Sequence, residues 1–245
     1  MKMFTSKLLP DVALIHAFTC KTSHNIAFHV GDNTHDVIQH RKTLASTLNY
    51  PHDRLVSMKQ IHSDKVVAVT ATHHHKAPVT CDALITNEPN TPLMVMTADC
   101  TPVLLYDRHT SAVAAIHAGR AGALSNIIAN TLTKMAEQFH SDSRNIIAVL
   151  GPSICQKCYE VNQDIYEETL ALGYDSAVMC KAQRYFLHVN TVLVQQLQEC
   201  GVTKNHIDVM KHCTACEHHT FFSYRAQKGN TGRQAGIIML RSSLS

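Results

Sequence analysis

Six short runs of mostly apolar residues do most to constrain how this 245-residue chain can fold. Most are continuous, and each is only four or five residues long, which is short for a helix. Such runs are typical of strands that are buried on both faces of a sheet. They are Val66–Thr70, Leu93–Met96, Val103–Tyr106, Ala112–Ile116, Ile146–Leu150 and Ile237–Leu240.

Several of these predicted strands follow one another directly, with no room for a helix between them. This order favours a mixed sheet or two stacked sheets over a doubly wound parallel sheet. The sequence therefore predicts a layered α/β (α+β) protein. Hydrophobic residues make up 45% of the chain, and no repeat or linker divides it, so we expect a single domain over residues 1–245.

Four further segments carry the signals of helices, namely apolar residues three and four apart or capping residues at their ends. They are 34–48 after Asn33 and Thr34, 122–139, a segment from Asn162 to before Gly173, and 189–200 before Gly201.

Charge and cysteine content exclude several classes of protein. The net charge is only +3, and Lys and Arg are scattered, so we expect no nucleic-acid partner. No apolar stretch is long enough to span a membrane, and Pro10 and Asp11 interrupt the apolar N-terminus, which argues against a signal peptide. Nine cysteines, an odd number, are then expected as reduced thiols in the cytoplasm.

Three polar segments at the ends of predicted strands need a chemical explanation. Each carries a residue that binds zinc well, namely His62, Cys100 and His117. Small residues follow His117 and would let the backbone approach a ligand closely. Three ligands leave a fourth position open for water or substrate, so the sequence predicts a catalytic zinc site. The segments are Lys59–Ser63, Thr97–Pro102 and Ala115–Gly119.

Two other interpretations stay open at this point. Cys100 and the two histidines can instead be ordinary buried residues, because their spacing matches no short zinc motif. A separate four-thiolate metal site is conceivable from the pairs Cys155/Cys158 and Cys213/Cys216. Those pairs lie more than fifty residues apart, and histidines crowd the second pair. Phosphate-binding loops, dinucleotide-binding turns and serine nucleophile elbows are absent from the sequence.

Several segments, in order, resemble the YfiH-like proteins, also called laccase-domain or peptidoglycan-editing-factor proteins. The resemblance runs from about Asn25 to the C-terminus. It is carried by Gln60-Ile61-His62, Ala98–Leu105, His117-Ala118-Gly119, Gly151–Ile154, Cys158–Val161, Cys213-Thr214, Phe221–Arg225 and Thr231-Gly232-Arg233.

The resemblance implies an α-β-β-α sandwich with mixed sheets and one Zn²⁺ on His62, Cys100 and His117. It also implies phosphorolysis of purine nucleosides (inosine, adenosine, methylthioadenosine) together with adenosine deaminase activity. The expected partners are thus nucleosides and phosphate, with the protein a monomer or a homodimer. Of the second cysteine pair, the resemblance covers Cys213 but not Cys216.

Further site residues follow from the resemblance and from charge. Arg225, Lys228 and Arg233 are the cations expected to hold phosphate. Asp99, beside Cys100, is expected either to orient a histidine ligand or to cap a turn. The resemblance adds three polar candidates for the substrate pocket, Asn25, Gln60 and Glu160.

Two other activities compete with phosphorolysis. A cysteine hydrolase or peptidoglycan-editing factor would use Cys100 as nucleophile and His117 as base. The family's older name, polyphenol oxidase or laccase, implies an oxidoreductase with several coppers, hence several close His-x-His pairs. Only His73 and His75 have that spacing, so the residues do not support copper. A third class of function is that of a metal-binding regulatory or partner protein without catalytic activity.

The sequence departs from the family at two expected arginines. The family's His-Ala-Gly-Trp-Arg-Gly segment here has Arg120 in place of the tryptophan and Ala121 in place of the arginine. Near the N-terminus, Lys21 replaces a second arginine and restores only a point charge. If those arginines bind phosphate, this chain should bind it weakly.

Overall fold

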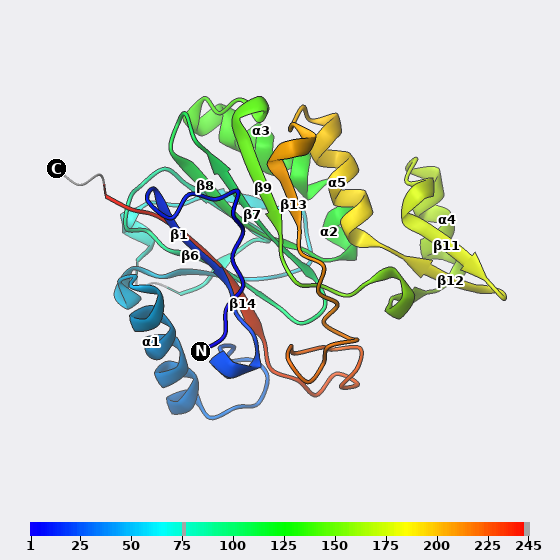
Figure 1. Ribbon diagram of the computed structural model, residues 1–245, viewed down its shortest axis with the longest axis horizontal. Helices are drawn as coiled ribbons and strands as arrows, with labels where there is room; N and C mark the ends of the chain where they lie inside the picture. Colours follow the sequence, from blue (N-terminus) through cyan, green and yellow to red (C-terminus); the bar gives the residue numbers. More distant parts are fainter. Residues whose placement is uncertain (75–76, 243–245) are drawn as a thin grey trace.

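Two β-sheets stacked face to face form the centre of the protein (Figure 1). The computed structural model describes residues 1–74 and 77–242. The first sheet has five strands in the order β1-β14-β6-β2-β4. Their bounds are Leu14–Phe18 (β1), Gln234–Leu240 (β14), Leu93–Thr97 (β6), Val56–Lys59 (β2) and Val79–Thr80 (β4).

The second sheet has six strands in the order β13-β9-β7-β8-β5-β3. Neighbouring strands run antiparallel at its centre, but β13 pairs with β9, and β3 with β5, in parallel. All six predicted strands form, as β3, β6, β7, β8, β9 and β14, so the expected mixed sheets are confirmed. The bounds are Ile207–Val209 (β13), Ile146–Leu150 (β9), Thr101–Asp107 (β7), Ala112–Ala118 (β8), Ala83–Thr86 (β5) and Val66–Ala68 (β3).

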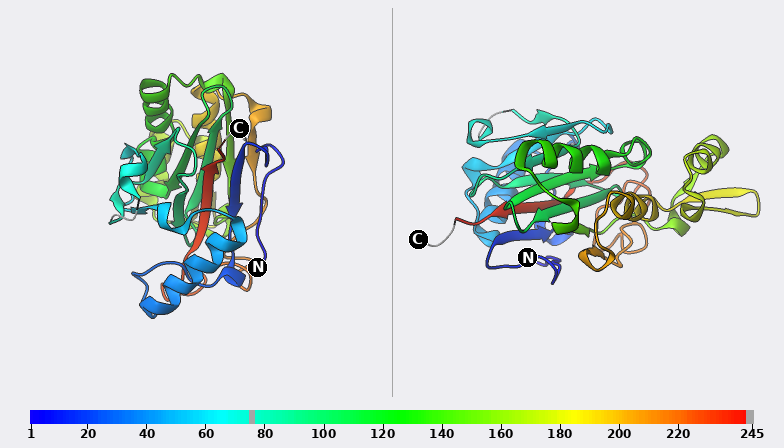
Figure 2. Two further views of the ribbon diagram at one scale, coloured as in Figure 1. Left: turned by 90° about the vertical axis from the view of Figure 1, so that its left-hand side faces the viewer. Right: turned by 90° about the horizontal axis from the view of Figure 1, so that it is seen from above.

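The side chains of these strands fill three layers of core. In β5, Leu84 packs between the two sheets, whereas Ile85 packs on the opposite face of its sheet, against the helices. In β14, Ile238 packs between the sheets and Ile237 packs toward α1. Because both faces of both sheets are covered, most strands are apolar throughout. The layers are helix, sheet, sheet and helix, which confirms the expected α-β-β-α sandwich (Figure 2).

The helices lie close to the predicted positions. Helix α1 (Thr34–Leu48) covers the first sheet, and its cap is Asn33, whose side chain accepts a hydrogen bond from the His35 amide. Helix α5 (Val189–Glu199) ends just before Gly201, which has φ +93°. Asn162 caps helix α4 (Gln163–Ala171).

One helix prediction needs correction. The segment 122–139 is not one helix but parts of two, α2 (Arg120–Leu124) and α3 (Ile127–Phe139). Asn126 breaks the helix, since it adopts a left-handed conformation with φ 62° and caps α3 by accepting from the Ala129 amide. Both helices face the second sheet, so the apolar periodicity continues across the break.

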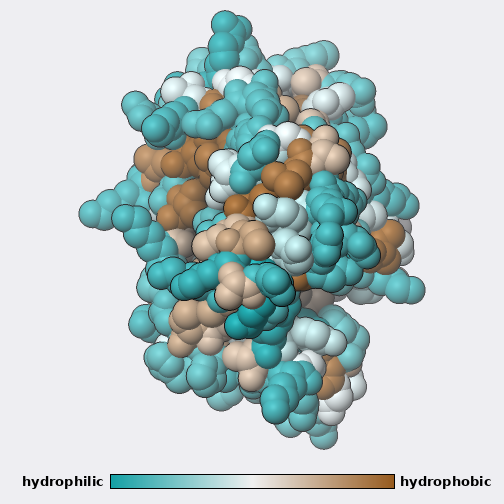
Figure 3. Space-filling view, turned by 90° about the vertical axis from the view of Figure 1, so that its right-hand side faces the viewer, coloured by the Kyte–Doolittle hydropathy of each residue, from teal (hydrophilic) through white to brown (hydrophobic). Residues whose placement is uncertain are grey.

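A small three-stranded sheet projects from one end of the sandwich together with α4 (Figure 1). Its strands, in the order β10-β12-β11, were not expected from the sequence. Figure 3 views this end and shows mainly hydrophilic side chains around separate hydrophobic patches. No helix in the described residues is long and apolar enough to cross a membrane. The bounds are Glu160–Val161 (β10), Arg184–Leu187 (β12) and Val178–Lys181 (β11).

Candidate metal and substrate site

His62, Cys100 and His117 come together at one end of the sandwich. Their ligand atoms all lie within 4.8 Å of one another. His62 follows β2, Cys100 lies in the turn between β6 and β7, and His117 stands on β8. The two imidazole rings meet edge to face, with centroids 4.8 Å apart. The sequence prediction of a three-residue cluster is therefore matched by the geometry.

The location of the cluster follows from the sheet topology. Strands β2, β4 and β6 belong to the first sheet, and each is followed by a strand of the second sheet, β3, β5 and β7. The chain thus passes from the first sheet to the second three times, and these three crossings carry His62, Asp82 and Cys100 respectively. Two of the crossings need unusual backbone angles, with φ 57° at His62 and 91° at Asp99.

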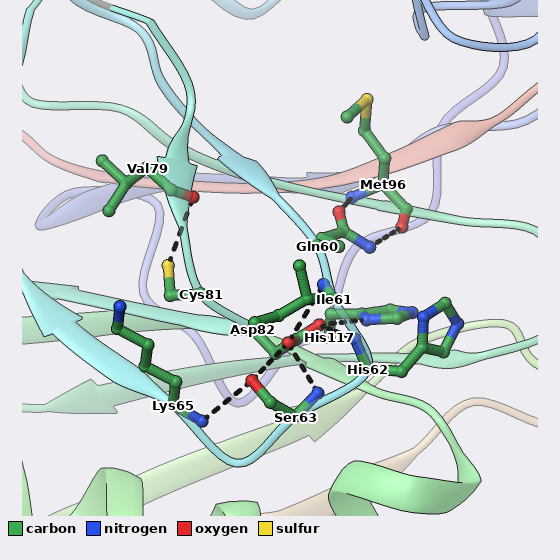
Figure 4. Close-up of polar contacts among 10 residues, drawn as sticks. All are labelled: Gln60, Ile61, His62, Ser63, Lys65, Val79, Cys81, Asp82, Met96 and His117. Carbon is green, nitrogen blue, oxygen red and sulfur yellow. Dashed lines mark hydrogen bonds and ion pairs between the residues drawn. The ribbon is translucent and has the colours of Figure 1, made fainter.

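Asp82 is the residue that organises this site, and it was not among the residues predicted from the sequence. Its fully buried carboxylate accepts hydrogen bonds from the amides of Ile61, His62 and Ser63 at 3.2, 3.0 and 2.7 Å. It also accepts from the Ser63 hydroxyl at 2.7 Å and lies 2.8 Å from Nδ1 of His117 (Figure 4).

The contact with Asp82 selects the tautomer of His117. An ionised carboxylate only accepts hydrogen bonds, so the proton of the neutral imidazole resides on Nδ1 and the lone pair on Nε2. A carboxylate behind a histidine ligand is the usual arrangement at metal sites. One sequence signal could have identified Asp82, since it is a charged residue directly before the apolar run Ala83–Ile85.

The charges of the site favour metal ligation. Burial opposes ionisation of Asp82, but hydrogen bonds from His117 and Ser63 outweigh it and hold its pKa at about 2. Burial likewise raises the pKa of the Cys100 thiol, yet in the metal-free site the charge of protonated His117 and hydrogen bonds from both histidines lower it to about 6. The thiol is thus readily available as the thiolate, the form that binds metals.

Gly119 provides the space that the cluster needs. A Cβ atom at this position would lie 3.1 Å from both Cys100 Sγ and His62 Cδ2. Any side chain here would therefore press on two of the three ligands. This explains why a small residue follows shortly after His117, as expected from the need for close backbone approach.

A cavity of about 650 Å³ opens next to the cluster. This volume lies within the usual range for small-molecule sites. Of the residues expected at the substrate pocket, Gln60, Arg225 and Arg233 do line it, as does Asp99. Other lining residues were not singled out in advance; they include His29, Met96, Ile154, Tyr159, Val189 and Tyr224.

The pocket residues are held by main-chain contacts. The Gln60 amide donates to the Met96 carbonyl at 2.7 Å and accepts from its amide at 2.9 Å (Figure 4). The Arg225 guanidinium donates to the carbonyl of Glu160 at 3.0 Å and lies over the Tyr159 ring, 5.3 Å from its centroid. Arg233 donates to the carbonyls of its two preceding residues. Both arginines are thereby fixed at the pocket wall.

The carboxylate that contacts His117 is that of Asp82 and not that of Asp99, for which two roles were left open, to orient a histidine ligand or to cap a turn. The two oxygens of Asp99 instead accept from the Thr214 hydroxyl at 2.6 Å and from the Arg225 amide at 2.7 Å. Asp99 thus connects the crossing turn to the loop that carries Arg225.

Three other predicted residues lie away from the pocket lining in the described part of the chain. Asn25 is buried, and its side-chain oxygen accepts from the amides of Ala27 and Arg233, so it positions Arg233. Glu160 forms an exposed ion pair with Arg184. Lys228 lies in a left-handed turn with φ 50°.

The two departures from the family pattern occupy different surroundings. Arg120 begins α2 and lines the pocket, with Nη1 4.0 Å from the Glu168 carboxylate. Ala121 follows it but is not part of the lining in the described residues. Lys21 donates to the His218 carbonyl at 2.6 Å.

Comparison with known proteins assigns the chain to a family. The model of a family described as multi-copper polyphenol oxidoreductase laccase matches residues 17–241. The chain belongs to this family, the YfiH-like proteins. A purine nucleoside phosphorylase of Corynebacterium glutamicum is 36% identical over 219 residues, which cover 89% of this chain and 87% of the relative. The purine nucleoside phosphorylase YfiH of Escherichia coli is 34% identical over 220 residues, 89% and 86% of the two chains.

Solved structures of YfiH-like proteins share the fold. The YfiH protein of Bacillus licheniformis superposes with a TM-score of 0.88 at 30% identity and covers 93% of both chains. A Neisseria meningitidis family member, NMB0706, gives a TM-score of 0.85 at 28% identity and covers 99% of this chain.

The family's laccase description has limited support in the arrangement of ligands. The described residues gather two groups of three or more potential ligands from His, Cys, Asp and Glu, and only the cluster of His62, Cys100 and His117 contains histidine. His73 lies in a short 3-10 helix, Ala71–His73, and its partner His75 lies outside the described residues. The cluster supports one bound metal ion rather than a multicopper centre.

Proposed function

We propose that this YfiH-like protein is a zinc-dependent purine nucleoside phosphorylase that also deaminates adenosine. The observation that carries the proposal is the convergence of His62, Cys100 and His117 at a pocket that also presents Arg225 and Arg233. Relatives that align over most of their length are named purine nucleoside phosphorylases, which supports the same activity here.

The ligand set supports zinc. One thiolate and two imidazoles are common donors at catalytic zinc sites, which keep a fourth position open. Around a tetrahedral zinc ion, with bonds of about 2.0–2.3 Å, such ligand atoms are roughly 3.3–3.8 Å apart. In this structure the ligand atoms of the three residues all lie within 4.8 Å of one another, so small side-chain movements would bring them to these distances. Bound zinc would serve as a Lewis acid and activate an oxygen nucleophile.

Other residues of the pocket would bind the phosphate, bind the purine and hold the metal ligands in position. Arg225 and Arg233 supply planar, permanently charged donors that suit a phosphate group. In phosphorolysis, phosphate attacks the anomeric carbon of the ribose while the purine leaves with the electrons of the glycosidic bond. Apolar side chains of Met96, Ile154 and Val189 line the same cavity and suit a purine ring. Asp82 keeps His117 and the loop around His62 in place.

The substrates provide the direct test. Purified protein should convert inosine to hypoxanthine only when phosphate is present, and should convert some adenosine to inosine without phosphate. The reason is that phosphate is a reactant in the first reaction and water in the second. Products are separated by chromatography. Release of hypoxanthine that is independent of phosphate would identify a hydrolase and contradict the proposal.

One observation favours a second candidate, a cysteine hydrolase. The lowered pKa of Cys100 beside His117 also describes an activated thiol nucleophile. Metal content separates the two candidates, because a zinc-bound thiolate is not available for attack. Protein that is active without metal, and that iodoacetamide inactivates at Cys100, would support the hydrolase.

Arg120 and Ala121 provide a test of phosphate binding. We expect weak phosphorolysis with a high phosphate requirement, and the double change Arg120→Trp with Ala121→Arg should lower the KM for phosphate. One charged hydrogen bond contributes roughly 1.5–3 kcal/mol, hence a change of about ten- to a hundredfold. The measurement is initial rate against phosphate at saturating inosine.

The single change Arg120→Trp is the matched control for that variant, since it removes the pocket arginine without adding one at position 121. A double variant that folds and keeps its metal, but has an unchanged KM for phosphate, would show that position 121 does not serve phosphate here.

A further inference from the structure

A second cluster of cysteines lies outside the site described above. Cys155 and Cys158 belong to the loop after β9, and Cys213 and Cys216 belong to the turn after β13. Strands β9 and β13 are parallel neighbours, so the two loops that follow them start side by side at the carboxyl ends of the strands. Ser153 and Cys213 continue the parallel pairing as an isolated bridge. This topology brings together two Cys-x-x-Cys pairs that are far apart in the sequence.

The four sulfur atoms have the spacing of a metal site. All lie within 4.8 Å of one another, and Cys158 Sγ and Cys216 Sγ are 3.3 Å apart. Four thiolates around a tetrahedral zinc ion, with Zn–S bonds of about 2.3 Å, have sulfurs about 3.8 Å apart. The distance between Cys158 and Cys216 is somewhat shorter than that value, and the 4.8 Å limit on all four sulfurs is compatible with it.

Backbone amides already point at one of the sulfurs. The amides of Cys155 and Cys216 both lie close to Cys213 Sγ, at 3.2 and 3.4 Å. Amide donors of this kind stabilise a thiolate and orient it as a ligand. Four thiolates without a cation would repel one another strongly, whereas a divalent metal offsets half of their charge and attracts each sulfur.

The histidines near the second pair do not belong to the group of close ligand atoms. His212 Nδ1 lies 3.0 Å from the Glu217 carboxylate, and His218 Nδ1 lies 3.1 Å from the Ala215 carbonyl. The ligand group at this place in the described residues consists of the four cysteines alone, so it offers a set of four identical donors.

We propose that Cys155, Cys158, Cys213 and Cys216 bind a second zinc ion with a structural role. Four protein ligands close the tetrahedron and leave no position for substrate, which is the hallmark of a structural zinc site. This ion is separate from the one at His62, Cys100 and His117.

The proposed ion joins two loops that build the wall of the substrate pocket. Ile154 and Tyr159 flank the first cysteine pair and line the pocket. Thr214, between the second pair, donates to Asp99. Arg225 donates to the Cys158 carbonyl at 3.4 Å. Metal binding at the cysteines would thus fix the loops that hold Tyr159 and Arg225 in the pocket.

Metal counting on the full-length protein, purified with a thiol reductant, tests the proposal. We expect two zinc ions per chain in the wild type, one in Cys100→Ala, one in the double variant Cys158→Ser with Cys216→Ser, and none in the combined variant. Cys180→Ser is the matched control, because Cys180 is an exposed cysteine on β11 outside both clusters. It should keep two. Loss of one ion only from the Cys158/Cys216 variant separates this proposal from failure of the catalytic site.

A second measurement needs no variant that might fail to fold. Wild-type protein is treated with iodoacetamide before and after zinc removal by a chelator, and labelled peptides are identified by mass spectrometry. The four cysteines should be protected with zinc and labelled without it. Labelling of all four before chelation, a disulfide between Cys158 and Cys216, or iron in place of zinc would overturn the proposal.

Discussion

Replacement of Cys100 by Ala is expected to remove the metal of the substrate pocket and to abolish nucleoside turnover. Cys100 is the sole thiolate of the cluster, and its geometry and lowered pKa both suit ligation. Lewis-acid activation contributes several kcal/mol to such reactions, so a loss of about 4 kcal/mol would reduce kcat/KM by about a thousandfold. The measurements are bound zinc and initial rates with inosine and with adenosine.

His62→Ala and His117→Ala should give the same result, since each removes one of three ligands. Cys180→Ser controls for the loss of a cysteine in general. The metal assignment fails if metal-free wild-type protein retains full activity, or if all three single variants retain the zinc of this site.

Replacement of Asp82 by Asn is the second change with a large expected effect. The carboxylate accepts hydrogen bonds from three amides and one hydroxyl and contacts His117, whereas an amide group presents two hydrogens in place of one acceptor. Loss of such a partner behind a metal ligand typically weakens metal binding by about ten- to a hundredfold. Zinc affinity is measured by competition with a chelator of known affinity.

Asp107→Asn is the matched control for Asp82→Asn. Asp107 is also fully buried, but it accepts from the amides of His109 and Thr110 in the β7–β8 turn. Both variants should lose thermal stability, and only Asp82→Asn should lose zinc affinity. An equal loss of affinity in both would mean that Asp82 acts through general stability and not through His117.

The strands that could be predicted from the sequence are those whose residues are almost all apolar. Strand β8 is buried along its whole length, and its run of alanine, valine and isoleucine residues indicates such burial from the sequence alone. Strands β1 and β5 were not predicted, although they are buried along their whole length. Strands β2, β4 and β10 could not be predicted, because they are short and partly exposed and exist only through pairing with distant segments. The break at Asn126 was hidden because the apolar stripe continues past it.

The metal ligands of the candidate site could be predicted from the sequence, whereas the residue that holds them in position could not. His62, Cys100 and His117 could be named because their residue types suit a metal and their segments matched a family pattern. Asp82 was not named: its position before an apolar run is a weak signal, and its hydrogen bonds join it to a loop about twenty positions away and to a strand thirty-five positions away. The four cysteines were doubted for their separation in sequence, and only the parallel pairing of β9 and β13 accounts for their proximity.

The three crossings between the sheets also restrict where the chain can change in length. Each crossing ends directly in a strand whose alternate residues face different layers, so one inserted residue would exchange the two faces of that strand. It would also move His62, Asp82 or Cys100 away from the others. The turn between β7 and β8 and the projecting α4 region carry no such constraint. Insertions and deletions should therefore accumulate there during evolution, while the crossings keep a constant length.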